Sequence, residues 1–594
     1  MAVGRSTPPL RGGCRIWATS QRLVWVLLGA VVSANAATAQ TPDAPHDTAA
    51  ARALASEYLA AYQARYPESD PTNREDLFDN RIEAEQAWSG RESAFLERLR
   101  RIAPNLSPGS AEATTLALLR ERLEMSQQFR VCRRELWNVS PLTGWLNEYR
   151  AHAARQPVGS EAERGAALTR WSKLPHFIDR EIANLQAGLR AGYAAPQQLV
   201  QATVEQADQI LALPTAGSPF FSPAVRDSSP AFRASMEELV RDRITPALQR
   251  YRDYLFSEYA AHARQSVGIA ALPDGAACFR ALVRRYTTLD TAPSELSAKG
   301  RRLMATGDAN AIRARERALL ADPANRFDSS REALATMTAA LQRAGDAAPQ
   351  WFNRLPEPLV PLVDSMPDGG PSDPDAVYVP GSGGEPPRVY VNVPRILEPG
   401  GRLYAERLAF HEGIPGHHLQ SALQSTADVH PLNRMLWNAG LGEGWAVYAS
   451  NLADDMGLYS SDASRIGLAT SRLDDGLTYV VQHGLHVLGW TREQAVDTML
   501  RHSGAERGTV EQQVDYFIAA PAHALAYPAG ARYIEELKLD ASRRLGALFE
   551  VRRFHDLILE SGSLPLTALR EAVERWIETE LEWRAPNPPR SLPP

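Results

Sequence analysis

Cysteine is scarce in this chain, with three among 594 residues. Cys14 lies in a basic N-terminal stretch, and Cys132 and Cys278 are 146 positions apart. Two distant cysteines are too few for a cysteine-based metal site. In an oxidising compartment they are able to pair, and two separate buried thiols would fit the pattern equally well. The sequence leaves both states open.

An excess of positive charge is also missing. The formal net charge is −6, and no long run of like charges occurs. Proteins that bind nucleic acids or anionic membranes show a basic excess or a basic stripe. Composition therefore excludes both classes of partner, and we expect no nucleic acid. With 44% hydrophobic and 23% charged residues, the chain is suited to one large globular unit or two intergrown ones.

Long apolar runs are absent apart from Leu23–Val32 near the N-terminus, which is about half the ~20 residues that span a bilayer. Four arginines and no acidic residue precede this run, and small residues follow it. This pattern predicts a secretory signal peptide over residues 1–39, cleaved after Ala36 or Ala39. We expect a periplasmic or secreted protein without a membrane anchor after cleavage. The pattern leaves the oligomeric state open.

The first half of the mature chain is predicted to be helical. Apolar residues recur there at three- and four-residue steps, and prolines and glycines separate the segments. The clearest of these helical stretches are Ala51–Tyr66, Ala94–Ile102, Ala111–Met125, Ala162–Leu174 and Ile178–Leu189. No cluster with an obvious chemistry accompanies them, so residues 45–270 are interpreted as a helical scaffold.

The second region, residues 271–590, is expected to carry the chemistry and to form one intergrown unit with the scaffold. It is expected to be less regular after Leu272–Gly275. The runs Ala376–Val379 and Arg388–Val393 flank a loop rich in proline and glycine and predict a small β-hairpin. After Gly401 the pattern is helical again, so the fold class is mostly α with a small β element.

The segment around His411 and Glu412 carries the strongest chemical signal. A helical H-E-x-x-H motif places two histidines one turn apart, so that both imidazoles reach one zinc ion beside a glutamate base. Here Pro415 stands four residues after His411, and the next histidines are six and seven residues on. Six residues rise about 9 Å along a regular helix, which is too far for shared ligation.

Pro415 and Gly416 offer a way to close this gap. Proline interrupts the helical hydrogen bonds and glycine tolerates unusual torsions, so we expect the helix to bulge there. The bulge would bring His417 to the second ligand position. His418 remains the alternative ligand, and otherwise lies behind the metal or faces the substrate.

Glu443 is predicted to be the third ligand. It is the one acid in an otherwise apolar, small-residue helix, where a carboxylate is costly unless it is paired or bound to metal. A buried salt bridge is the alternative. Two imidazoles and one carboxylate leave a fourth position for water, which is the arrangement of catalytic Zn²⁺. Glu412 is then the general base.

These motifs resemble known families. The Glu443–Ala446 string resembles the third-ligand motif of gluzincin aminopeptidases, and Gly416–Leu419 resembles the second-ligand end of the metal helix in helical carboxypeptidases and oligopeptidases. The chain as a whole resembles a bacterial family called domain of unknown function 885. The matching strings are Leu272–Gly275, Thr287–Asp290, Tyr390–Asn392, His411–Gln420, Glu443–Tyr448, Gly484–His486, Gly489–Glu493 and Phe554–Asp556. The resemblance implies a large, mostly helical, zincin-like metallopeptidase fold.

Amide hydrolysis also needs a donor to the oxygen of the attacked carbonyl. The resemblance favours Tyr527, then His486, for this role. His523 and Tyr533 are weaker candidates. Each of these side chains would serve equally well as an interior residue with a satisfied hydrogen bond.

Substrate contacts are predicted around the second strand. Val389–Val393 is expected to be an edge along which a peptide substrate adds as a further strand, with Tyr390 and Asn392 close to it. Arg388 and Arg532 are among many basic residues able to hold a substrate carboxylate, and the sequence does not choose among them.

The function expected from the sequence is therefore an exported zinc-dependent peptidase that hydrolyses short peptides. One alternative keeps the metal centre and changes the substrate to a non-peptide amide or an amino-acid conjugate. A second alternative is a peptide-binding protein without catalysis, against which the complete set of His411, Glu412, His417 and Glu443 argues.

Overall fold

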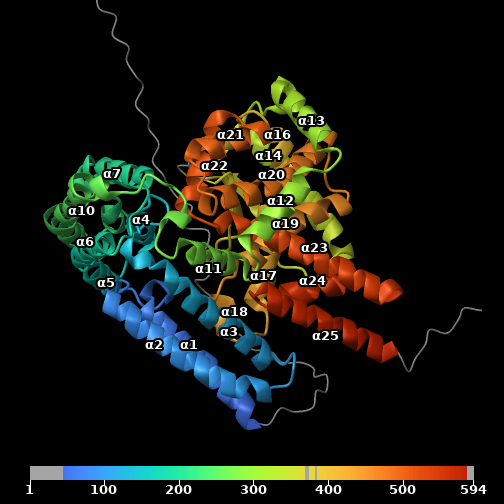
Figure 1. Cartoon of the computed structure of the whole chain (residues 1–594), viewed down its shortest axis with the longest axis horizontal. Helices are drawn as coiled ribbons and strands as arrows, with labels where there is room; N and C mark the ends of the chain where they lie inside the picture. Colours follow the sequence, from blue (N-terminus) through green and yellow to red (C-terminus); the bar gives the residue numbers. More distant parts are fainter. Residues whose placement is uncertain (1–44, 368–373, 382–383, 585–594) are drawn as a thin grey trace, which may run out of the picture.

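The computed structural model describes residues 45–367, 374–381 and 384–584 (Figure 1). The predicted signal peptide over 1–39, with Ala36 and Ala39, lies outside these residues, and so does the end of the predicted catalytic region, 585–590. Within the described residues, no helix is both long enough and apolar enough to cross a membrane.

Helices build the N-terminal part of the molecule, coloured blue to green in Figure 1. The first three, which pack against one another along the lower edge of that view, are α1 (Pro45–Arg65), α2 (Ile82–Ile102) and α3 (Ala111–Phe129). The next seven are α4 (Trp145–Arg155), α5 (Glu161–Ser172), α6 (Leu174–Arg190), α7 (Gln197–Leu211), α8 (Ser222–Val225), α9 (Pro230–Leu239) and α10 (Thr245–Ser257). Every helical stretch predicted in this half overlaps one of them, so the prediction that this half is helical is confirmed.

The prediction of an irregular region after Gly275 is wrong. Four helices follow there, namely α11 (Gly275–Thr287), α12 (Pro293–Met304), α13 (Ala309–Ala321) and α14 (Ser330–Ala347). A proline of this region starts a helix where the sequence suggested a break: Pro293 begins α12, where its fixed φ suits the first helical position. Ser329 caps α14 by accepting a hydrogen bond from the Glu332 backbone N–H.

A small mixed sheet lies between α14 and the next helices. Its strands are β1 (Leu362–Ser365), β2 (Ala376–Val379) and β3 (Arg388–Val391), in the order β1-β3-β2. β2 and β3 pair antiparallel, which confirms the predicted hairpin, and β1 pairs parallel to β3. β3 is therefore the central strand. The expectation that it forms an edge is wrong, because β1 occupies its other side.

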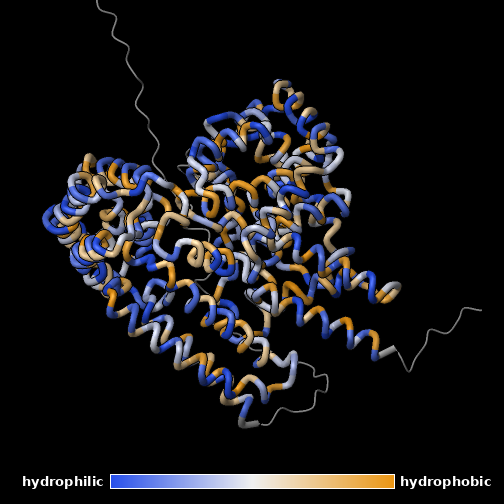
Figure 2. Tube along the Cα trace, viewed as in Figure 1, coloured by the Kyte–Doolittle hydropathy of each residue, from blue (hydrophilic) through white to orange (hydrophobic). Residues whose placement is uncertain are grey.

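The chain is helical from Gly401 to Arg584, as predicted. A short helix, α15 (Val393–Ile396), precedes this part. The helices that follow are α16 (Gly401–Glu412), α17 (His417–Thr426), α18 (Pro431–Met435), α19 (Ala439–Asp455), α20 (Asp462–His486), α21 (Arg492–His502), α22 (Arg507–Ala519), α23 (Ala526–Leu545), α24 (Val551–Glu560) and α25 (Leu566–Arg584). Figure 2 shows apolar and polar positions interleaved along these helices, as expected where one face of each packs inward.

Core clusters connect the two parts of the chain. Leu432 and Leu436 pack with α1–α3, and Leu142 packs with α20–α22. Cys132 and Cys278, whose state the sequence leaves open, form a disulfide across a separation of 146 residues. In the chain-entropy account, closing a loop of that size stabilises the fold by about 4–5 kcal/mol. The disulfide links the segment after α3 to α11.

Candidate metal centre

The histidine motif lies at a break between two helices. α16 ends at Glu412 and α17 begins at His417, so the expected bulged helix is instead two helices joined by a tight connection. Gly416 makes this connection possible, since an added Cβ there would lie 1.9 Å from the backbone carbonyl oxygen of His411. The chain folds back on the end of α16 and thereby brings His417 beside His411.

Substitution of Gly416 tests this connection. Gly416→Ala is expected to lower the free energy of unfolding by about 3 kcal/mol or more, because the methyl group collides with backbone that is unable to move aside. The displaced connection should also separate the two histidines and weaken metal binding. Thermal denaturation and metal titration check both effects.

The matched control for this prediction is Gly508→Ala in α22, where an added Cβ meets no atom within 4 Å. Its stability should stay the same or rise by up to ~1 kcal/mol, as for alanine in place of glycine in a helix. Equal stability of the two variants would contradict the role given to Gly416.

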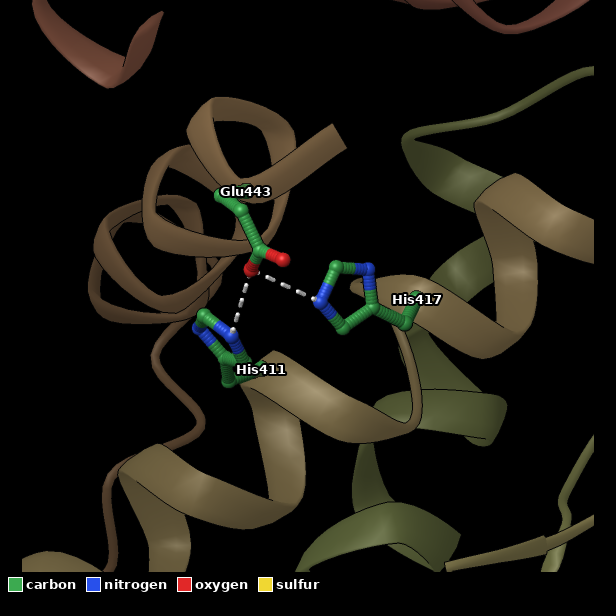
Figure 3. A group of neighbouring side chains, drawn as sticks. All are labelled: His411, His417 and Glu443. Carbon is green, nitrogen blue, oxygen red and sulfur yellow. Dashed lines mark ion pairs between the residues drawn. The ribbon is translucent and has the colours of Figure 1, made fainter. Parts of the chain in front are cut away.

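Three side chains converge at the break. The Nε2 atoms of His411 and His417 lie 3.8 Å and 3.3 Å from Glu443 Oε2, and one potential ligand atom from each residue lies within 4.8 Å of the others. The two imidazole rings stand perpendicular with centroids 4.9 Å apart. Figure 3 shows both rings turned toward the carboxylate, which comes from a different helix.

Close packing of α19 against α23 places Glu443 in this position. A Cβ added at Gly444 would lie 2.4 Å from the Cα of Gly530, so the two helices touch backbone to backbone. The indole N–H of Trp445 donates to the carbonyl oxygen of Pro415 at 2.9 Å. Glu443 is thus attached, through its own helix, to the connection that presents His417.

The pKa of each of these three residues depends on the charge of one or both of the others. Burial lowers the pKa of His411 to about 4. Burial acts to lower the pKa of His417 as well, but the hydrogen bond and charge of Glu443 outweigh it and raise the value to about 9. Burial acts to raise the pKa of Glu443, yet the two histidines hold it well below its ordinary value. A cation, here a proton on His417, therefore balances the buried carboxylate.

This donor set fits a divalent metal ion. Two imidazole nitrogens and one carboxylate oxygen already face a common point, and they match the ligands of catalytic zinc sites. An ion at that point would take over the charge balance that the proton otherwise provides.

Glu412 lies beside the triad without belonging to it. Its Oε1 is 4.0 Å from His411 Nε2, and its Oε2 accepts a hydrogen bond from the Tyr378 backbone N–H at 2.8 Å. Burial raises the pKa of Glu412 to about 7, against the charge of His417, which lowers it. A carboxylate with a pKa in this range is able to take up and release protons near neutral pH.

His418 is turned away from this cluster. One ring nitrogen, Nδ1, lies 3.1 Å from the Tyr378 hydroxyl, and the other, Nε2, lies 3.0 Å from the carbonyl oxygen of Pro358. With both nitrogens engaged, His418 joins α17 to the sheet. Of the two histidines that the sequence offers as second ligand, the structure brings His417 to the cluster.

The cluster opens into a cavity of about 430 Å³. Its walls come from β2 and from helices α16, α17 and α19–α23. Its lining includes His411, Glu412, His417, Glu443 and Tyr527. A volume of this size accommodates a small molecule or a short peptide.

Comparison with known proteins agrees with this architecture. A family model described as "Bacterial protein of unknown function (DUF885)" matches residues 59–573. The chain belongs to this family. No curated protein matches this DUF885 chain.

Two solved structures share the fold of this DUF885 protein. One is a protein of Colwellia psychrerythraea described as a putative lipoprotein, with a TM-score of 0.78 and 20% identity over 90% of this chain and 99% of that one. The other, from Shewanella oneidensis, is described as a putative lipoprotein of unknown function, with a TM-score of 0.62 and 16% identity over 87% and 98% of the two chains. Both support a mostly helical fold with a small sheet.

Tyr527 and His486, the two residues predicted to donate a hydrogen bond to the substrate carbonyl oxygen, have different positions in the DUF885 fold. The Tyr527 ring stacks near that of His411 with centroids 6.3 Å apart. Burial raises the pKa of Tyr527 well above its ordinary value, and Glu443 adds to the shift, so its hydroxyl keeps its proton. His486 does not line the cavity: its Nε2 lies 3.0 Å from the Phe517 carbonyl oxygen, and its Nδ1 faces a backbone N–H. The structure brings Tyr527 to the site and leaves His486 in the helical core.

The weaker donor candidates are also placed. His523 contacts the Tyr516 hydroxyl and lies near Tyr527, with ring centroids 6.1 Å apart. The hydroxyl of Tyr533 accepts a hydrogen bond from Arg570 at 2.8 Å, and Tyr533 does not line the cavity.

The residues predicted to contact substrate lie elsewhere. Tyr390 and Asn392 do not line the cavity, and Asn392 is fully buried. The strand beside the metal cluster is β2, an edge strand whose Ala376, Val377 and Tyr378 line the cavity. The sequence has no clear signal for β1. The prediction therefore took β3 for the edge strand, whereas β2 is the edge strand beside the cluster.

Many residues of the cavity wall were not predicted from the sequence, among them Trp437, Tyr516 and Arg407. Trp437 lies near His417, with ring centroids 6.4 Å apart, and Tyr516 lines the wall formed by α22. Arg407 stands four residues before His411 on α16 and therefore on the same face of that helix. Helical periodicity could have revealed Arg407, whereas the other two reach the cavity through long-range folding.

Proposed function

We propose that this DUF885 protein is an exported zinc-dependent peptidase of zincin-like fold that cleaves short peptides. The observation that supports it most is the convergence of His411, His417 and Glu443, with Glu412 beside them, on one wall of a cavity. Export is supported by the signal-peptide pattern and by the description of the two similar structures as lipoproteins.

Zinc held by His411, His417 and Glu443 would supply Lewis-acid chemistry and lower the pKa of a water molecule. The buried Glu412 carboxylate, held by the Tyr378 backbone N–H, is positioned to take a proton from the attacking water and pass it to the leaving amine. The protonated hydroxyl of Tyr527 donates to the carbonyl oxygen of the scissile amide as negative charge develops there. β2 is an edge strand along the cavity, and its backbone on either side of the Tyr378 N–H held by Glu412 is positioned to pair with the substrate backbone.

A peptide library incubated with the purified protein tests this function. Mass analysis of the products should show cleavage of short peptides, loss of cleavage after treatment with a chelator, and recovery when zinc is added back. Chelator-sensitive turnover of non-peptide amides alone would favour the first alternative. Peptide binding without any cleavage would favour the second, and either result would contradict the proposal.

A further inference from the structure

The cavity wall includes the guanidinium of Arg407. Asp375 and Asp474, which also line the cavity, form ion pairs with Arg395 and Arg313. In the part of the chain that the structure describes, the Arg407 guanidinium makes no hydrogen bond or ion pair. Its Nε is buried and has no acceptor. The charge of Arg407 lowers the pKa of the cavity acids Glu412, Asp474 and Asp475, but none of them forms a hydrogen bond with its guanidinium. Its N–H donors therefore suit an anion supplied from outside.

The position of Arg407 is fixed and close to the metal cluster. It precedes His411 by one turn of α16, about 6 Å along the helix axis. The neighbouring Glu406 forms an ion pair with Arg343 and accepts a hydrogen bond from the Ser460 backbone N–H, which holds this turn of the helix in place. The guanidinium is therefore presented to the cavity from a rigid element.

Other basic residues are already engaged. Arg388 lies 3.2 Å from Asp364, and Arg532 lies 2.9 Å from Glu535. The two arginines named from the sequence as possible carboxylate anchors are therefore neutralised by the chain itself. Within the described residues Arg407 forms no such ion pair, and its fork of N–H donors matches the two oxygens of a carboxylate.

We propose that Arg407 binds the terminal carboxylate of the substrate, so that the protein removes residues from the C-terminus of short peptides. This rests on the proposed peptidase function and names its mode of cleavage. One helix turn between anchor and metal ligand leaves room for one or two extended residues beyond the cleaved bond, at about 3.5 Å each. The released product is an amino acid or a dipeptide.

The competing anchor is Asp475, a cavity acid with no hydrogen bond or ion pair within the described residues, although the charges of Arg532 and Arg407 act on it. An acid there would suit the free amine of a peptide and removal of N-terminal residues. Burial raises the pKa of Asp475 to about 7, so this carboxylate takes up a proton more readily than an ordinary aspartate. The planar fork of N–H donors on an arginine matches the two oxygens of a carboxylate, which favours Arg407 as the anchor.

Two blocked peptides test the assignment: acetyl-trialanine with a free carboxylate, and the same peptide as its C-terminal amide. The wild-type protein should prefer the free acid. Arg407→Gln should lower kcat/KM for the free acid by roughly 10- to 100-fold, mainly through KM, as expected for loss of a hydrogen bond between charged groups. The preference for acid over amide should collapse, and Arg407→Lys should restore part of it.

Arg402→Gln is the matched control, because Arg402 lies on the same helix, pairs with Glu332 and does not line the cavity. It should retain the preference for the free acid. Equal turnover of acid and amide by the wild type would overturn the role of Arg407 while leaving the peptidase function intact. So would faster cleavage of trialanine amide with a free amine than of acetyl-trialanine, if Asp475→Asn removes that preference.

A binding measurement separates failure of the anchor from failure of the function. Calorimetric titration of Glu412→Gln protein with acetyl-trialanine requires no turnover. Arg407→Gln in that background should weaken binding of the acid by a similar factor and affect the amide less. If both peptides lose affinity equally, the anchor is wrong. If no peptide is cleaved by the wild type, the peptidase function is wrong whatever the titration shows.

Discussion

Glu412→Gln is expected to lower kcat for peptide hydrolysis by about 10²- to 10⁴-fold, the usual contribution of a general base. The amide keeps the size of the side chain and is able to accept the hydrogen bond from the Tyr378 backbone N–H, so the fold should persist. It has no basic oxygen to take a proton from water. Because Glu412 is not one of the three converging ligands, metal content should be unchanged.

Steady-state kinetics together with metal analysis of the same preparation check this expectation. Glu398→Gln is a matched control, since Glu398 is an exposed acid just before α16 and does not line the cavity. Its activity should equal that of the wild type. Near-normal turnover in Glu412→Gln would remove the general base from the account, and loss of metal from it would make Glu412 a ligand instead.

Two variants, His417→Ala and His418→Ala, are expected to distinguish the histidine that binds the metal from the histidine that only supports the fold. His417→Ala removes one of the three proposed ligands, and zinc affinity should fall by more than the 10- to 100-fold that loss of a supporting residue around a metal produces. His418→Ala removes the contacts with Tyr378 and Pro358 that join α17 to the sheet. It should lower thermal stability and retain most of the zinc.

Competition with a chelator of known affinity measures both variants. The account requires the larger loss of affinity in His417→Ala and the metal-retaining behaviour in His418→Ala. A larger loss of zinc affinity in His418→Ala than in His417→Ala would mean that His418 is the ligand and that the break between α16 and α17 does not serve to position His417.

The metal cluster was predictable because most of its signal is local. His411, Glu412 and His417 lie within seven residues, and the pair Pro415-Gly416 indicates that the helix is interrupted between them. The form of that distortion was not predictable. Whether a proline–glycine pair bulges a helix or ends it depends on packing such as the bond from Trp445 to the Pro415 carbonyl, which comes from another part of the chain.

The parts that sequence reasoning missed depend on longer-range contacts. His486 has the pattern of a functional histidine, yet its ring bonds to backbone of α22 and to the segment before α11. The order of the sheet depends on β1, four residues with no alternation of apolar and polar side chains to reveal them. In the region of α11–α14, prolines interrupt the helical periodicity of apolar residues in the sequence. Such a proline starts a helix in the structure, as Pro293 starts α12.

The metal centre itself is tested most directly by anomalous X-ray diffraction at the zinc edge, on crystals of zinc-loaded protein. The account predicts one strong peak bonded to an imidazole nitrogen of His411, an imidazole nitrogen of His417 and the Glu443 carboxylate, at about 2.0–2.2 Å. Absence of a peak there, or a peak bonded to His418 or to another part of the chain, would contradict it.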